Sequence, residues 1–254
     1  MTTPLKGYGL DYKRKPNIAL FKRNGDSWLH LILFCEVKNK ADPSTEKESY
    51  IELTGKSACL LFMQDSRHVA PSIRILGSKI YFTIFDHGGS VSTSGFDIHE
   101  DPEPFLRIII SLSCYHDKPD ILGLDTSIAW EKKRARHVPP RKVLKVTVRR
   151  GLLLVSIRIT LTKLLFISDN LLGRGTTVWK GEAVEGLEKL IPVAVKNTWI
   201  DPLRKYTEGV ILRMLNKAGI EGVPTLIYEG QVSKVYDKDA DGQQSTMNHS
   251  THSI

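Results

Sequence analysis

The chain of 254 residues has no apolar run of roughly eighteen residues, which is about the length that a membrane-spanning helix requires. Its most apolar stretch, residues 151–167, contains Arg158 and Lys163. The first sixteen residues, MTTPLKGYGLDYKRKP, lack the apolar core of a secretory signal. We therefore expect neither a membrane span nor a secretory signal.

Cysteine is also scarce. The three cysteines, Cys35, Cys59 and Cys114, are widely spaced, and each lies in an apolar segment. A disulfide framework or a zinc cluster would need cysteines at short, paired spacing. We expect reduced core thiols, and therefore an intracellular protein of the cytoplasm or the nucleus.

Hydrophobic residues make up 41% of the chain and charged residues 25%, which excludes wholesale disorder. The net charge is +8, and residues 131–180 alone carry 13 Lys and Arg against two Asp and Glu. Such a band attracts nucleic acid or another acidic partner, here through residues 132–150. Residues 132–136, KKRAR, also have the composition of a nuclear import signal, although a solvated linker is an equal alternative.

In the first half, strand and helix patterns are mixed. Residues 26–38 and 79–85 predict strands, as do residues 72–75, which a short turn separates from residues 79–85. Residues 41–48 are polar and predict a loop, and residues 49–67 predict a helix. A second helix is expected after Asp101.

Beyond Trp130 the pattern changes. Apolar and polar residues alternate strictly from Val155 to Thr162, which predicts a half-buried strand. Two further strands, a helix near residues 204–218 and another strand follow, so we expect an antiparallel sheet with one helix. The expected fold class is α+β. The expected domains are an N-terminal α/β region (1–130), a basic linker (131–150), a small lobe (151–236) and a disordered tail (237–254).

A glycine turn and a lysine suggest chemistry in this second half. Gly173, Arg174, Gly175 and Thr176 connect two apolar segments, and glycines at such a turn let backbone N–H groups approach phosphates. The strand Pro192–Lys196 ends in a lysine, as the lysine-bearing strand of protein kinases does. Glu208, in the following helix, could hold that lysine.

These features belong to a wider resemblance. The chain resembles the fungal-type protein kinase family from about Trp28 to Val232. The segments that carry the resemblance are Glu36–Lys38, Gln64 with Arg67, Phe85–Gly89, Ser94–Ile98, Pro104–Arg107, Gly123–Asp125, Gly173–Thr176, Val195–Trp199 and Glu208–Leu212.

The resemblance implies a family-specific N-terminal region followed by a protein kinase N-lobe that binds ATP and Mg²⁺. It implies phosphoryl transfer to a Ser or Thr hydroxyl of an unknown protein substrate. The nucleotide-binding residues would be Gly173, Arg174, Gly175, Thr176 and Lys196. The catalytic pair would be Lys196 and Glu208.

The sequence departs from the kinase pattern at three points. The third glycine of the phosphate loop would fall at Val178, and only twelve positions separate Lys196 from Glu208. No His-Arg-Asp and no Asp-Phe-Gly follow Val232. We therefore expect a truncated kinase product without its C-lobe, which binds nucleotide at most. A non-catalytic interaction fragment is an alternative.

The first half suggests a rival site. Asp26 and Glu36-Val37-Lys38 flank one expected strand, an arrangement that resembles the PD-(D/E)xK nucleases, in which carboxylates hold Mg²⁺ and a lysine polarises water. Gln64 and Arg67 would follow on the next helix. A strand-end salt bridge is the alternative, because an acid-x-Lys tripeptide occurs elsewhere in this chain.

Overall fold

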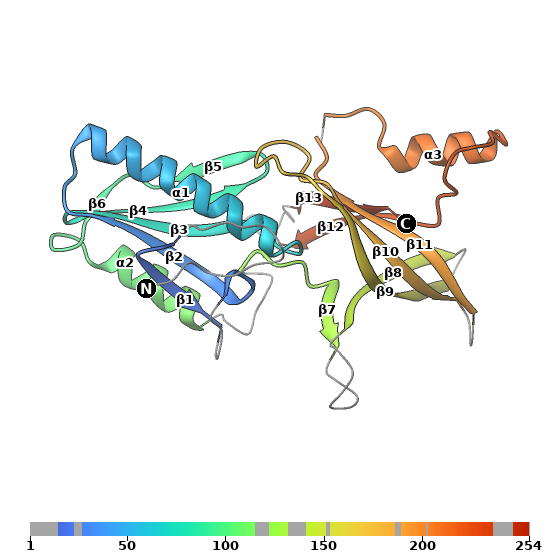
Figure 1. Cartoon of the computed structure of the whole chain (residues 1–254), viewed down its shortest axis with the longest axis horizontal. Helices are drawn as coiled ribbons and strands as arrows, with labels where there is room; N and C mark the ends of the chain where they lie inside the picture. Colours follow the sequence, from blue (N-terminus) through green and yellow to red (C-terminus); the bar gives the residue numbers. More distant parts are fainter. Residues whose placement is uncertain are drawn as a thin grey trace, which may run out of the picture. The chain divides into compact units, whose positions relative to one another are not determined.

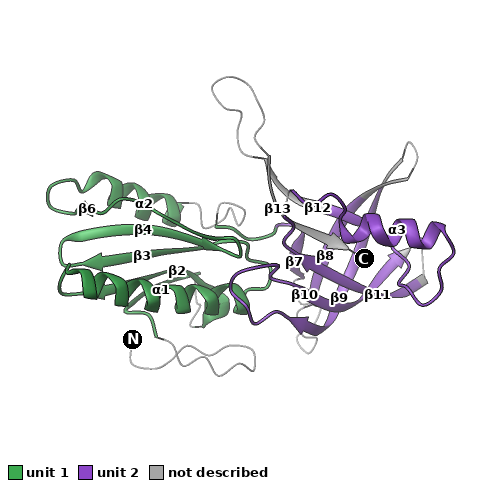
Figure 2. Cartoon of the chain, turned by 90° about the horizontal axis from the view of Figure 1, so that it is seen from above, with its two compact units in different colours: residues 1–125 green, residues 126–254 purple. Residues whose placement is uncertain are grey.

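A computed structural model describes residues 15–22, 27–114, 122–131, 141–150, 153–185, 189–201, 203–235 and 246–253. The chain divides into two compact units, unit 1 (residues 1–125) and unit 2 (residues 126–254), coloured separately in Figure 2. Each unit has its own β-sheet, and helices occur in both, so the α+β class predicted from the sequence is confirmed. No helix of the described part is long and apolar enough to cross a membrane.

Unit 1 is a mixed sheet with a helix on each side (Figure 2). Strands run in the order β1-β2-β3-β4-β5, β6 pairs with β4, and β2 and β3 are parallel because α1 crosses over between them. The elements are β1 (Ile18–Phe21), a short 3₁₀ helix (Trp28–His30), β2 (Leu31–Lys38), α1 (Pro43–Met63), β3 (Ala70–Leu76), β4 (Lys79–Asp86), β5 (Gly89–Ser92), β6 (Phe96–Asp97) and α2 (Glu103–Cys114).

Helix α1 begins at Pro43, in the stretch where we expected a loop. The Asp42 side chain caps the helix by accepting a hydrogen bond from the Thr45 backbone N–H at 3.0 Å. Pro43 occupies the first helical position, where its missing N–H has no cost. The polar composition of this stretch is therefore that of a helix N-terminus.

The two faces of the unit 1 sheet differ in polarity. On β3, the buried Ile73 belongs to an apolar cluster with Leu112 of α2, whereas Ser72 and Arg74 point to the opposite face. Arg74 donates to the Glu46 carbonyl of α1 at 3.3 Å. Polar side chains therefore lie between the sheet and α1, beside buried apolar residues of the same helix such as Leu53 and Leu60.

Unit 2 is an antiparallel sheet with one helix, as expected. Its strands run in the order β12-β13-β11-β10-β9-β8-β7 (Figure 1). The elements are β7 (Ile128–Glu131), β8 (Arg141–Arg150), β9 (Leu153–Ile167), β10 (Thr177–Glu185), β11 (Lys189–Thr198), α3 (Glu208–Lys217), β12 (Glu229–Val235) and β13 (Thr246–Ser253).

Two of these strands lie in segments for which we expected no regular structure. Arg141–Arg150, part of the expected linker, form β8 because Leu144 and Val146 alternate with polar residues and pack against β9. Thr246–Ser253, part of the expected tail, form β13, which pairs with both β11 and β12. Residues 132–140 and 236–245 lie outside the described residues.

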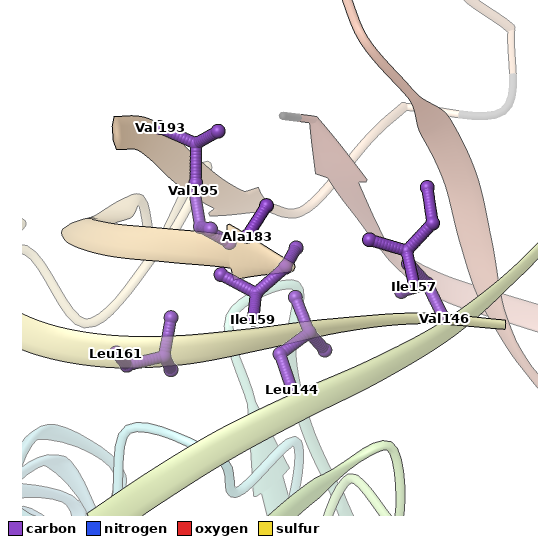
Figure 3. Close-up of a cluster of buried hydrophobic side chains, with 8 residues drawn as sticks. All are labelled: Leu144, Val146, Ile157, Ile159, Leu161, Ala183, Val193 and Val195. Carbon is purple, nitrogen blue, oxygen red and sulfur yellow. The ribbon is translucent and has the colours of Figure 1, made fainter. Parts of the chain in front are cut away.

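Alternate residues near the middle of β8 and β9, with residues of β10 and β11, form one buried cluster. Figure 3 shows Ile159 of β9 beside Leu144 of β8 and Ala183 of β10. Ile159 is fully buried. The cluster consists of Leu144, Val146, Ile157, Ile159, Leu161, Ala183, Val193 and Val195.

We expect Ile159→Ala to lower the free energy of unfolding by about 3 kcal/mol, because it leaves a cavity in the centre of this cluster. Leu164→Ala is the matched control: Leu164 lies on the same strand but is exposed, and its loss should change stability by no more than about 0.5 kcal/mol. Urea denaturation followed by circular dichroism measures both. Equal effects of the two substitutions would contradict the assignment of this core.

Candidate functional site

Lys196 lies near the end of β11, on the face of the sheet opposite the apolar cluster. Side chains alternate along a strand, and Val193 and Val195 both belong to the cluster shown in Figure 3. The next side chain, Lys196, therefore points to the other face, where it is half-buried. In the pairing of β11 with β10, Lys196 lies opposite Val178.

The glycine turn lies between β9 and β10 and is tied to the end of β11. The Arg174 carbonyl accepts hydrogen bonds from the Trp199 N–H at 2.8 Å and from the Thr198 hydroxyl at 3.2 Å. Gly173 and Gly175 have φ angles of 118° and 47°, in a region that other residues rarely adopt. The two glycines therefore permit the bend that brings Arg174 to this anchor.

Glu208 is the first residue of α3 and reaches both neighbouring cations. The Thr207 side chain caps the helix by accepting from the Val210 N–H at 3.2 Å. From there the Glu208 carboxylate forms an ion pair with Lys196 and a second one with Arg174 at 3.3 Å. Twelve positions between Lys196 and Glu208 are therefore enough for contact.

The charges in this cluster are positive overall. Burial raises the pKa of Glu208, but hydrogen bonds and charges from Lys196 and Arg174 outweigh burial and lower that pKa below its ordinary value. Glu208 is thus ionised, and one carboxylate balances two cations. A small pocket adjoins the pair and is lined by Arg174, Thr198, Ile200, Arg204, Thr207, Glu208 and Glu229.

Glu229 of β12 fixes the start of α3 from the other side. Its carboxylate accepts hydrogen bonds from the Gly209 N–H and from the Thr207 hydroxyl, both at 3.0 Å. A methyl group at position 209 would overlap that carboxylate. The glycine after Glu208 therefore leaves room for the group that holds the helix N-terminus.

Of the residues predicted from the sequence, the structure brings Lys196, Glu208 and Arg174 into direct contact. Thr176 joins them indirectly, because its hydroxyl lies 3.1 Å from that of Thr198. Thr198, Arg204 and Glu229 were not predicted from the sequence as site residues. The only signal for Glu229 was Gly209, because a residue with a side chain is normally tolerated in the first turn of a helix.

The rival site of unit 1 is an ion-pair cluster. Glu36 and Lys38 of β2 both face α1: the buried Lys56 contacts Glu36, and Lys38 donates to Glu52 at 3.0 Å. Asp26 lies outside the described residues. The nuclease hypothesis thus stays a prediction. Glu36 and Lys38 each bind an oppositely charged side chain of α1, so the Glu36 carboxylate is already engaged in an ion pair.

Gln64 and Arg67, which we placed beside that site, hold the start of β2. The Gln64 amide donates to the Leu31 carbonyl at 2.8 Å, and the buried Arg67 donates to the carbonyls of Leu31 and Ile32, each at 3.2 Å. These bonds satisfy backbone oxygens where β2 begins. Both side chains are therefore engaged in structure.

The basic run is visible only in part. Within Arg141–Arg150, the buried Lys142 ammonium lies over the Trp179 ring at 4.8 Å and the Trp130 ring at 5.9 Å. Its charge is therefore covered by aromatic rings instead of facing solvent. Residues 132–140, with the expected import signal, lie outside the described residues, so nucleic-acid binding stays a prediction.

Comparison with known proteins gives one result. A family model described as fungal protein kinase matches residues 14–253. No curated protein and no solved structure matches the chain. The family match covers both units and includes the cluster around Lys196 and Glu208.

The Glu36 cluster should make the stability of unit 1 depend on pH. Burial, together with the hydrogen bond to Glu52, raises the pKa of Glu36 from an ordinary 4.5 to about 7, and Lys56 offsets only part of this. The folded protein therefore holds the proton to a higher pH than the unfolded chain does. The resulting stabilisation is complete below pH 4.5 and is lost as the pH rises to about 7.

We expect wild-type protein to lose stability over this range relative to Glu36→Gln, which cannot titrate. Urea denaturation at several pH values measures the difference. Glu48→Gln, which removes an exposed carboxylate 3.6 Å from Lys38, is the control and should follow the wild-type curve. Parallel curves for wild type and Glu36→Gln would refute the prediction.

Gly209→Ala should destabilise unit 2, although replacing glycine by alanine within a helix ordinarily stabilises by about 1 kcal/mol. The new methyl group displaces the Glu229 carboxylate, so the Gly209 N–H and the Thr207 hydroxyl lose their acceptor. We expect a loss of about 1–2 kcal/mol in chemical denaturation. A variant as stable as wild type would show that Glu229 does not fix the helix.

Proposed function

The chain belongs to the fungal protein kinase family, and we propose that unit 2 binds ATP between its glycine turn and the Lys196–Glu208 pair. Lys196 contacts the α- and β-phosphates in this proposal. Backbone N–H groups of the turn Gly173–Thr176 approach the phosphates, and the Arg174 side chain adds a second cation.

One observation carries the proposal: the Lys196 ammonium of β11 contacts the carboxylate of Glu208, the first residue of α3. The glycine turn precedes β10, so Lys196 lies on the second strand after the turn, and α3 is the next helix. In protein kinases the corresponding lysine pairs with a helix glutamate and with the nucleotide phosphates. The glycine turn is anchored two residues beyond this lysine, at Thr198. The groups that would surround a triphosphate thus converge from three segments.

The chemistry that we propose for the site is phosphoryl transfer to a Ser or Thr hydroxyl of a protein substrate. That reaction also needs an aspartate that orients the hydroxyl and an Asp/Asn pair that holds the metal ions. The sequence motifs that supply these groups do not follow Val232. We therefore propose nucleotide binding for this chain by itself, and phosphoryl transfer for a form that includes those groups.

The family implies Mg²⁺ together with ATP. In nucleotide sites Mg²⁺ binds chiefly to phosphates and to one or two carboxylates. The described residues contain no group of three or more His, Cys, Asp or Glu side chains that could hold a metal ion. We assign no protein ligands to the ion, and the role of Lys196 does not depend on it.

Lys196→Ala should weaken the binding of ATP to the full chain by about tenfold or more, because a charge-assisted bond to phosphate is lost. Isothermal titration calorimetry with Mg·ATP measures this loss. The matched control is Lys180→Ala, which removes an exposed lysine of β10 in the same sheet. Circular dichroism shows whether both variants remain folded.

Two results would count against the proposal. One is a wild-type chain that does not bind ATP. The other is equal ATP affinity in the Lys196→Ala and Lys180→Ala variants, because binding would then depend on net charge and not on the position of Lys196.

A further inference from the structure

Two cations share one carboxylate oxygen in unit 2. Oε2 of Glu208 accepts from Lys196 and also lies 3.3 Å from Nη2 of Arg174. Lys196 alone would balance the charge of Glu208. The Arg174 guanidinium is therefore the surplus cation of the cluster, and its side chain is half exposed to solvent.

The backbone of Arg174 is held by hydrogen bonds, whereas its side chain makes one ion pair and is half exposed. Its carbonyl is held by Thr198 and Trp199, and a glycine with positive φ stands on each side. The long side chain projects from this anchor into the pocket that Arg204 also lines. An exposed ion pair such as Arg174–Glu208 is weak, so another anion can displace it.

Phosphate is the anion that suits this exchange. A guanidinium binds phosphate and carboxylate oxygens through the same planar arrangement of N–H groups, and a polyphosphate offers more charge than one glutamate does. We propose that Arg174 changes partner: it pairs with Glu208 in the empty site and with the phosphates of a bound nucleotide. This inference rests on the proposed function and adds that Glu208 competes with nucleotide for Arg174.

The competition gives Glu208 two opposite effects. The carboxylate positions Lys196 for contact with phosphate. By pairing with Arg174, it also keeps that second cation away from phosphate. Glu208→Gln keeps an oxygen that can accept a hydrogen bond from Lys196 but removes the charge that holds Arg174, so it should strengthen the binding of phosphates, and the gain should depend on Arg174. A general loss of negative charge near the site would strengthen binding whether or not Arg174 is present.

The experiment is a double-mutant cycle on the full chain with wild type, Arg174→Gln, Glu208→Gln and the double variant. Calorimetry measures the affinity of each for ADP and ATP. We expect Arg174→Gln to weaken binding and Glu208→Gln to strengthen it by roughly two- to fivefold, the weight of an exposed ion pair. In the Arg174→Gln background the gain from Glu208→Gln should largely disappear.

The controls separate this inference from the proposed function. Arg213→Gln removes an exposed arginine of α3, the helix that carries Glu208; the Arg213 guanidinium lies 3.7 Å from Glu229. This variant should bind ADP as wild type does. Adenosine, which lacks phosphates, should bind all four proteins of the cycle equally. If wild type binds ATP and Lys196→Ala does not, but Glu208→Gln gives the same gain with and without Arg174, the exchange is refuted and the proposed function stands. If wild type binds neither ADP nor ATP, both fail.

Discussion

A single carboxylate at the start of a helix joins three segments of unit 2. Glu208 connects α3 to Lys196 of β11 and to Arg174 in the turn between β9 and β10. The carboxylate can do so because two side chains fix its helix: Thr207 caps the first turn, and Glu229 binds that turn from β12. A change in the position of α3 would thus alter the ion pairs of both cations.

The sequence predicted the parts of this site that follow from local chemistry. The short apolar strand Pro192–Lys196 placed Lys196 at a strand end, and the glycine pair marked the turn. It did not predict that Glu229 caps α3, because that contact joins residues twenty positions apart. The pairing of Lys196 with Glu208 was predicted in spite of the short spacing, and the placement of α3 brings the two side chains into contact.

The same division applies to the fold. The apolar runs on either side of a short turn predicted β3 and β4 closely, and alternation predicted the middle of β9, which extends to Ile167. The start of α1 was missed because Asp42 and Pro43 are also common in turns. Strand β8 was missed because nearby basic residues and prolines concealed the alternation around Leu144 and Val146. The basic composition of this segment reflects its solvent-facing residues, whereas its pairing with β9 makes it a strand.

Buried polar side chains beneath α1 limit how that helix can lie on its sheet. An apolar helix face can slide by a turn and still bury similar surface, but Lys56 pairs with Glu36 of β2, and Arg74 of β3 donates to the Glu46 carbonyl of α1. Any shifted alignment would strand buried charges without partners, at a cost of several kcal/mol, roughly 3–5 for one broken pair. We infer that these residues specify a single docking of α1, which the buried leucines of the helix alone would not fix.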